Sequence, residues 1–171
     1  MKSTTNNQPE STVRILKRAT CPSLSGKSKL AYEVGLSDKK ELQVRVTSNT
    51  GGGCFNQDWV KLPAVEAVFD KVPAGEPVTS DTLRTMFRGM SQNTGGFTFA
   101  VLKHVGYVVP SVAKKRCYDR VEPTAFREEI AALIEGRVPP QVDAKLKKNV
   151  GKKAAPVKTP GVSTKSKKRP S

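Results

Sequence analysis

Two short glycine-rich segments are the parts of this sequence best suited to holding an anion. Residues 49–55 are Asn-Thr-Gly-Gly-Gly-Cys-Phe, and residues 93–97 are Asn-Thr-Gly-Gly-Phe. Glycine lets the backbone approach an anion closely, and successive backbone N–H groups can form an anion-binding concavity. Four shared residues are too few to indicate a structural repeat. The shared pattern therefore predicts only that the two loops line one surface.

A third segment, residues 21–28, resembles the phosphate-binding loop G-x-x-x-x-G-K-[ST], with Cys21 in place of the first glycine. That motif requires a strand, the loop, and then a helix whose N-terminus faces the phosphates. The residues that follow here alternate between apolar and polar with a period of two, which predicts a strand instead. We therefore do not expect nucleotide hydrolysis, and we interpret Lys27 and Lys29 as contacts to a phosphate backbone near the sheet edge.

The chain has few other residues that could do chemistry. Its three cysteines, Cys21, Cys54 and Cys117, are an odd number without paired spacing, which argues against a disulfide framework and a zinc site. We expect them to be buried, reduced thiols. His104, the only histidine, falls beside an apolar helical stripe, where a histidine is usually packed rather than catalytic. No pattern of acids suggests a catalytic pair, so the sequence predicts neither an enzyme nor a metal or cofactor site.

The sequence carries a large excess of positive charge, because 30 Lys/Arg against 15 Asp/Glu give a net charge of +15. Residues 141–171 contain ten Lys/Arg and one acid, a net charge of +9, and no aromatic residue. Such a segment cannot bury enough apolar surface to offset the entropy of ordering, so residues 137–171 are predicted to be a disordered basic tail. Its composition is similar to the Lys/Ala/Pro-rich tails of linker histones and bacterial nucleoid proteins. A polyanion is the expected partner, and nucleic acid is the commonest one.

Hydrophobic periodicity predicts the elements that would position these residues. Two runs of period two, residues 30–36 and 42–46, predict an antiparallel hairpin, and residues 13–20, which resemble a short strand with a basic face, extend it to a three-stranded sheet. Four segments with the apolar spacing of a helix follow, at residues 63–72, 80–88, 93–108 and 124–135. The predicted class is α+β, in which the sheet precedes a trihelical, helix-turn-helix-like bundle and a further C-terminal helix. Residues 13–136 form one domain, and the polar residues 1–12 are predicted to be disordered.

The second and third predicted helices, joined by a polar turn after Gly89, have the outline of a helix-turn-helix unit. If this unit binds DNA, its contacts fall at the start of the third helix. Free N–H groups there favour a phosphate, and amide side chains can reach adenine edges. The candidate residues are Arg88, Ser91, Gln92, Asn93 and Thr94. The alternative is an ordinary capped turn in a helical subdomain.

Further candidate contacts to phosphate are basic residues spread over the predicted sheet, the third helix and the tail. In the domain they are Arg14, Arg18, Arg45, Lys103, Lys114, Lys115 and Arg116. In the tail they are Lys145, Lys147, Lys148, Lys152 and Lys153. For the residues of the sheet, a solvated polar face is an equally good interpretation.

The sequence therefore predicts a non-enzymatic DNA-binding protein, a small regulator or an architectural factor whose tail adds salt-sensitive attraction. One alternative is an RNA-binding module that uses the sheet and the same tail. Another is a protein-interaction module, either an inhibitor of a nucleic-acid enzyme or a homodimer formed through Phe126, Ile130, Leu133 and Ile134. No apolar run approaches the roughly 18 residues of a membrane span, and no apolar secretory block is present. We expect a cytoplasmic, nucleoid-associated or nuclear protein, neither membrane-bound nor secreted.

Overall fold

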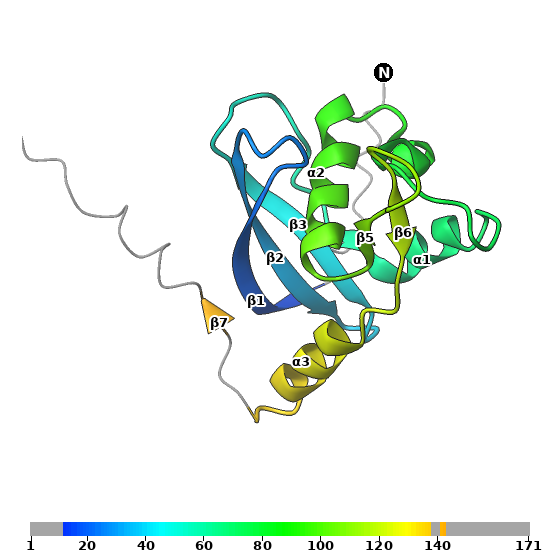
Figure 1. Ribbon diagram of the computed structural model, residues 1–171. Helices are drawn as coiled ribbons and strands as arrows, with labels where there is room; N and C mark the ends of the chain where they lie inside the picture. Colours follow the sequence, from blue (N-terminus) through cyan, green and yellow to red (C-terminus); the bar gives the residue numbers. More distant parts are fainter. Residues whose placement is uncertain (1–11, 138–140, 143–171) are drawn as a thin grey trace, which may run out of the picture.

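The computed structural model describes residues 12–137 and the backbone of residues 141–142, and it has the predicted α+β class (Figure 1). Strands β1 (Val13–Pro22), β2 (Lys29–Ser37) and β3 (Leu42–Asn49) pair antiparallel in chain order. The three predicted strands and their antiparallel pairing are therefore confirmed, with each strand two or three residues longer than its predicted segment, but the sheet has more than three strands.

Two very short strands extend this sheet. β4 (Val60–Lys61) pairs antiparallel with β3, and β7 (Gln141–Val142) pairs parallel with β1, giving the order β4-β3-β2-β1-β7. Two residues are too few to show a period, so the sequence predicts neither strand. β7 also corrects the prediction of a tail without structure, because backbone pairing needs no apolar pattern. The other residues of the predicted disordered ends lie outside the described residues.

Alternation along the strands separates a buried face of the sheet from a polar one. On β2, Leu30, Tyr32 and Val34 are at most 1% exposed and face the core. Glu33 lies between them in sequence and therefore on the opposite face. Burying one large apolar side chain contributes roughly 1.5–3 kcal/mol. The apolar face therefore decides which side of the sheet the helices must cover.

Two helices pack on the buried face of the sheet, and a third helical segment lies against them. α1 (Leu62–Phe69), the 3-10 helix η1 (Ser80–Phe87) and α2 (Gln92–His104) correspond to the first three predicted helices. α1 and α2 both pack on β3, and η1 lies against both of them. Figure 1 shows α2 in front of the sheet. The helices therefore form a layer on the sheet rather than the predicted trihelical bundle, because the apolar sheet face must itself be covered.

Local sequence explains where these helices begin. Pro63 occupies the first turn of α1, where its missing N–H costs nothing. Thr79 caps η1 in a capping box with the side chain three residues further on. Ser91 caps α2 by accepting a hydrogen bond from the backbone N–H two residues later.

The chain leaves the helical conformation earlier than its periodicity predicts. α2 ends at His104, Gly106 adopts a φ of +86°, and strand β5 (Val108–Pro110) follows. β5 pairs antiparallel with β6 (Tyr118–Arg120) in a second, two-stranded sheet. The prediction of a helix to residue 108 is therefore wrong. The β-branched residues 108 and 109 match a helical spacing, but their side chains favour a strand.

Helix α3 (Thr124–Ile134) confirms the fourth predicted helix. Its apolar stripe packs within the domain, since Phe126, Ile130 and Leu133 are at most 5% exposed. Ile134, with 39% exposure, is the one member of the stripe left at the surface. The surface predicted for a second copy of the chain is therefore mostly part of the core.

Candidate nucleic-acid interface

Four connections gather at one end of the main sheet, at the top of Figure 1. They are the β1–β2 loop (residues 23–28), the β3–β4 loop (residues 50–59), the turn between η1 and α2 (residues 88–91) and the β5–β6 loop (residues 111–117). We call this part of the molecule the loop end. The β2–β3 turn lies at the opposite end, because consecutive antiparallel strands reverse direction.

The two Asn-Thr-Gly-Gly segments lie side by side at the loop end, as the sequence predicts. The carbonyl oxygen of Cys54 accepts hydrogen bonds from the side-chain amide of Asn93 (3.0 Å) and from the hydroxyl of Ser91. The Thr94 hydroxyl accepts a further hydrogen bond from the backbone N–H of Asn56 (3.1 Å). These contacts fix the β3–β4 loop against the start of α2.

Gly53 shows what the glycines contribute to this contact. Its φ is +91°, and a Cβ at this position would lie 3.0 Å from Nδ2 of Asn93. Any other residue would strain the backbone and crowd the Asn93 amide. The Phe55 and Phe97 rings add an edge-to-face contact, with centroids 5.5 Å apart. Gly53, which directly follows the shared Asn-Thr-Gly-Gly residues, therefore serves the packing of one loop on the other.

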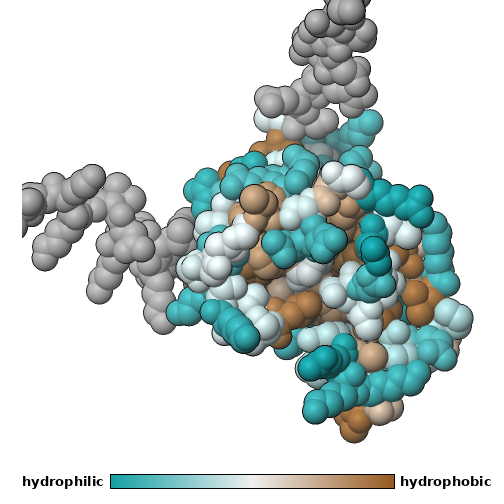
Figure 2. Space-filling view, turned by 90° about the horizontal axis from the view of Figure 1, so that it is seen from above, coloured by the Kyte–Doolittle hydropathy of each residue, from teal (hydrophilic) through white to brown (hydrophobic). Residues whose placement is uncertain are grey.

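A hollow of about 480 Å³ opens between three parts of the loop end. Its walls come from the β1–β2 loop, the start of the β3–β4 loop and the first turns of α2. The polar side chains that line it are Ser23, Ser25, Ser28, Asn49, Gln92 and Asn93. Lys27 is its one charged side chain among the described residues, and Phe97 is its one aromatic. Figure 2 looks onto this end, where hydrophilic residues (teal) surround lighter and brown ones.

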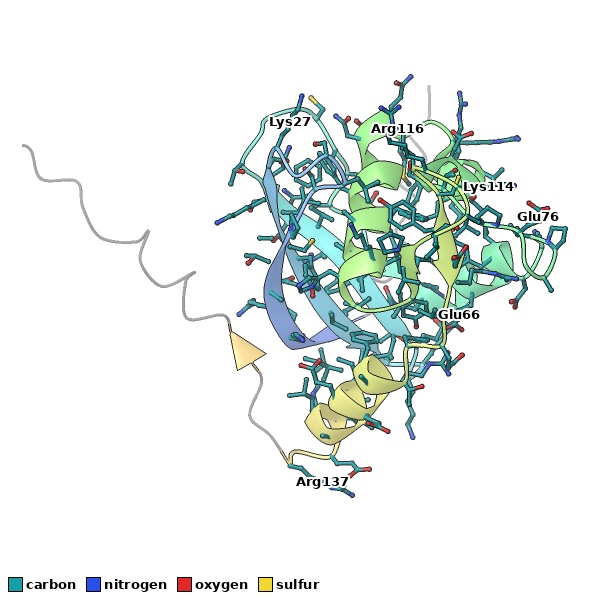
Figure 3. All side chains as sticks on the ribbon, in the orientation of Figure 1. Lys27, Glu66, Glu76, Lys114, Arg116 and Arg137 are labelled. Carbon is teal, nitrogen blue, oxygen red and sulfur yellow. The ribbon has the colours of Figure 1, made fainter. Side chains whose placement is uncertain are left out.

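Five cations at or beside the loop end are exposed and form no ion pair with another described residue. They are Lys27, Lys29, Arg88, Lys115 and Arg116. Figure 3 labels Lys27 and Arg116 at this end. Lys114, also in the β5–β6 loop, is instead 3.6 Å from the carboxylate of Glu76. The four connections contain a single acid, Asp58, so the loop end has an excess of positive charge.

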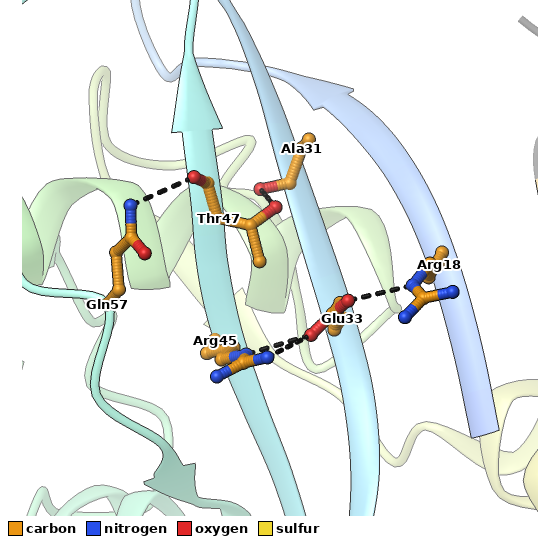
Figure 4. A network of polar contacts seen from close by, with 6 residues as sticks. All are labelled: Arg18, Ala31, Glu33, Arg45, Thr47 and Gln57. Carbon is orange, nitrogen blue, oxygen red and sulfur yellow. Dashed lines mark hydrogen bonds and ion pairs between the residues drawn. The ribbon is translucent and has the colours of Figure 1, made fainter. Parts of the chain in front are cut away.

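Two predicted phosphate contacts, Arg18 and Arg45, are engaged with Glu33 on the polar face of the sheet (Figure 4). Their Nε atoms donate to different oxygens of the Glu33 carboxylate, both at 2.8 Å, because the three residues face one another across β1, β2 and β3. Burial alone would raise the pKa of Glu33, but the hydrogen bonds and charges of the two arginines outweigh it and lower the pKa. Both arginines therefore have a partner within the sheet, and Arg45 also stacks on Trp59.

Other predicted contacts are likewise occupied within the domain. Arg14 donates to the carbonyl oxygen of Leu133 near the end of α3 (3.3 Å). The Lys103 ammonium lies 5.5 Å from the centre of the Tyr118 ring. Thr94 is only 5% exposed, so its side chain is not available to a ligand. The predicted contacts in the tail lie outside the described residues.

Helix α2 does not present a free flank to a DNA groove. Residues 98–102, in its second half, are at most 4% exposed, because they pack against the sheet and η1. A recognition helix must place one side in the major groove. At the N-terminus of α2, Gln92 and Asn93 are exposed, and both line the hollow. The part of the helix-turn-helix outline that remains accessible is therefore the start of α2, where the predicted contacts Gln92 and Asn93 lie.

A cleft of about 650 Å³ beside α1 has an excess of negative charge, opposite to that of the loop end. Five carboxylates and three cations line it, and Figure 3 labels two of these acids, Glu66 and Glu76. Glu66 accepts hydrogen bonds from the Tyr107 hydroxyl and from Arg127, both at 3.0 Å. Burial and then the charge of Glu66 raise the pKa of Tyr107, so its hydroxyl stays protonated at neutral pH. Excess negative charge repels phosphate, so we assign this cleft no part in binding a polyanion.

The cysteines and the histidine follow the prediction only in part. All three cysteines are free thiols, but only Cys21 is buried, and burial raises its pKa to about 11. Cys54 is exposed at the loop end and Cys117 is half-buried, so the prediction of buried thiols is wrong for both. His104 is exposed, although its Nδ1 lies 2.8 Å from the Tyr32 hydroxyl. Among the described residues, no three His, Cys, Asp or Glu side chains come together as a metal ion would require.

The sequence-based candidates do not include five of the polar and aromatic side chains that line the hollow, Ser23, Ser25, Ser28, Asn49 and Phe97. The three serines lie in the segment that resembles a phosphate-binding loop, and Asn49 and Phe97 lie in the two segments that share the Asn-Thr-Gly-Gly pattern. Treating the three glycine-containing segments as walls of one site would identify these residues from the sequence.

Comparison of this chain with protein-family models, with curated proteins and with solved structures gives no match. We therefore infer its function from the geometry and charge described above. Within the described residues, no helix has the length and apolar character needed to cross a membrane.

Proposed function

We propose that this chain is a non-enzymatic nucleic-acid-binding protein, specifically a small DNA-binding regulator or architectural factor. The observation that supports this proposal is the distribution of charge. Five exposed cations that have no acidic partner among the described residues lie at or beside the loop end, whereas Arg18 and Arg45 of the sheet are paired. Residues 141–171 add a net charge of +9. Nucleic acid is the common polyanion that such a distribution attracts.

The loop end and the tail have different parts in this proposal. The loop-end cations contact phosphates at fixed positions, because the sheet and α2 hold the loops that carry them. Contacts of this kind set the orientation of the protein on its ligand without selecting a sequence. The tail adds attraction through its charge and makes binding more sensitive to salt.

The loops, rather than the side of α2, approach the nucleic acid. The second half of α2 is covered, so the groove of a duplex cannot be filled by that helix as in a helix-turn-helix protein. Exposed Gln92, in the first turn of α2, lines the hollow together with Lys27, and exposed Arg88 lies in the turn before this helix. The phosphates therefore meet Lys27, Lys29 and Arg88 first.

Replacing Lys27 and Lys29 together with Ala tests this proposal. The measurement is fluorescence anisotropy of a labelled duplex DNA titrated with the full chain over a range of salt concentrations. Each lost phosphate contact lowers the slope of log K against log[salt] by about 0.9, so the double variant should lose about 1.8. The matched control is Lys39→Ala with Lys71→Ala, which removes the same charge from two exposed positions outside the loop end. An equal change of slope in both double variants would refute the assignment of phosphate contacts to the loop end.

The same titration decides between the ligand classes. Tighter binding to structured RNA than to DNA of matched sequence would favour the RNA-binding alternative. Failure to bind either polynucleotide at moderate salt would overturn the proposal and leave a role toward another protein. For that role the buried stripe of α3 offers only Ile134 as exposed apolar surface.

A further inference from the structure

We propose that the hollow at the loop end receives a single unpaired nucleotide, with its base beside Gln92 and Phe97 and its phosphate at Lys27. This inference rests on the proposed function and narrows it. The protein then prefers nucleic acid with an unpaired position, in DNA or in RNA, to a fully paired duplex.

The first support is the shape of the site. A duplex presents base edges inside its grooves, and proteins reach them with side chains that project outward. Gln92 and Asn93 instead line a hollow whose other walls are parts of residues 23–28 and 49–52. A stacked base cannot enter such a hollow, whereas a base that has left the stack can. The volume of about 480 Å³ lies in the range of small-ligand sites, roughly 300–1,000 Å³.

The second support is the chemical character of the walls. Serine hydroxyls and the amides of asparagine and glutamine both donate and accept hydrogen bonds, as the edge of a nucleobase does. Lys27 supplies one positive charge, which matches one phosphate, and no carboxylate of a described residue lines the hollow to oppose it. The cleft beside α1, by contrast, is lined by five carboxylates, which would repel a phosphate.

Gln92 has its hydrogen-bonding capacity free for a ligand. Its side chain is exposed and makes no hydrogen bond with another described residue. The Nδ2 of Asn93, by contrast, already donates to the carbonyl oxygen of Cys54. Gln92 is therefore the side chain that we assign to the edge of the base.

Phe97 is the aromatic group available for stacking on the base. It is half-buried, it lines the hollow, and its ring is held by the edge-to-face contact with Phe55 at 5.5 Å. Loss of an aromatic ring that stacks on a base weakens binding by roughly 5- to 150-fold. A ring already fixed by its neighbour needs little further ordering when the base arrives.

The experiment compares three labelled probes of one sequence with the full chain at one moderate salt concentration. They are an intact duplex, the same duplex with one extra unpaired nucleotide, and the single strand, each made as DNA and as RNA. We expect the probes with unpaired nucleotides to bind at least about 10-fold more tightly than the intact duplex. The DNA and RNA sets identify the source of the unpaired nucleotide.

Two variants assign this preference to the hollow. Gln92→Ala and Phe97→Leu should each remove most of the preference and leave the affinity for the intact duplex within about twofold. Because Phe97 is half-buried, the exposed Gln92 provides the test that does not depend on stability. Lys39→Ala, at the opposite end of the sheet, is the control and should keep the preference.

Equal affinity for the intact and the bulged duplex would overturn this inference, while salt-dependent binding of both would leave the proposed function standing. A preference that survives both Gln92→Ala and Phe97→Leu would also overturn it, because the unpaired nucleotide would then lie elsewhere. Failure to bind any probe would overturn the proposed function as well.

Discussion

Replacing Glu33 with Gln should destabilise the folded domain, because one carboxylate joins three strands. Its side chain is 9% exposed, and it accepts hydrogen bonds from Arg18 and Arg45, each at 2.8 Å. Glutamine keeps the shape of the side chain, but its NH₂ group must face one of the two guanidinium groups. The variant therefore loses one charge-assisted hydrogen bond and weakens the other.

The contacts and the exposure of the partners set the size of this effect. A hydrogen bond to a charged group contributes about 1.5–3 kcal/mol when it is buried. The side chains of Arg18 and Arg45 are 48% and 32% exposed, so water replaces part of what they lose. We expect the free energy of unfolding to fall by about 1–2 kcal/mol. The control Glu135→Gln breaks an exposed pair with Arg137 and should cost less than about 0.5 kcal/mol.

The pH dependence of this difference provides the second part of the test. The two arginines lower the pKa of Glu33 in the folded state below its value in the unfolded chain, near 4.3. The charge of Glu33 therefore stabilises the fold fully above that unfolded value, and this stabilisation is lost as the pH falls through the folded pKa. Urea unfolding of the native protein and of the Glu33→Gln variant, at neutral and at acidic pH, measures this stabilisation. The role assigned to Glu33 would be refuted if the unfolding free energies of the native protein and the Glu33→Gln variant differed by less than about 0.5 kcal/mol at neutral pH. It would also be refuted if that difference stayed the same in acid.

Two further predictions concern the loop end. Gly53→Ala should lower the free energy of unfolding by about 1–2 kcal/mol, because φ is +91° and the new Cβ would crowd Asn93. Gly52→Ala, with a φ of +72° and open space around it, carries only the backbone cost. Equal losses in urea unfolding would show that the contact with Asn93 is unimportant. Cys54 should react with a thiol reagent in the native protein, whereas buried Cys21, with a pKa of about 11, should react only on unfolding. Similar rates for both thiols would contradict the burial described here.

Strands β2 and β3 and the four helical segments could be predicted because their residues show clear periods. Alternation from Leu30 to Leu36 identifies β2 and its buried face, and the spacing of Phe126, Ile130 and Leu133 identifies α3. β4 and β7 contain two residues each and depend on backbone pairing, which leaves no pattern in the sequence. Periodicity extends α2 beyond its true end because Val108 fits both a helical spacing and a strand.

For the candidate site, the Asn-Thr-Gly-Gly pattern was the more informative part of the sequence, since the two loops that share it are neighbours. Charge was a poorer guide for single residues. Arg18 and Arg45 could not be distinguished from Lys27 without the register that places Glu33 between them. The position of Glu33 on the polar face of the same hairpin suggests such a partner, but only the strand pairing establishes it.

Salt dependence of nucleic-acid binding, measured for the full chain and for a chain that ends at residue 142, tests most directly whether the excess cations meet phosphates. Ending the chain after Val142 keeps the residues of β7 and removes all ten Lys/Arg of residues 143–171. If five or six of them contact phosphates, the slope of log K against log[salt] becomes shallower by about five units, and the shortened chain still binds through the loop end. Identical slopes for the two chains, or no binding of the full chain to either polynucleotide at moderate salt, would contradict the proposed function.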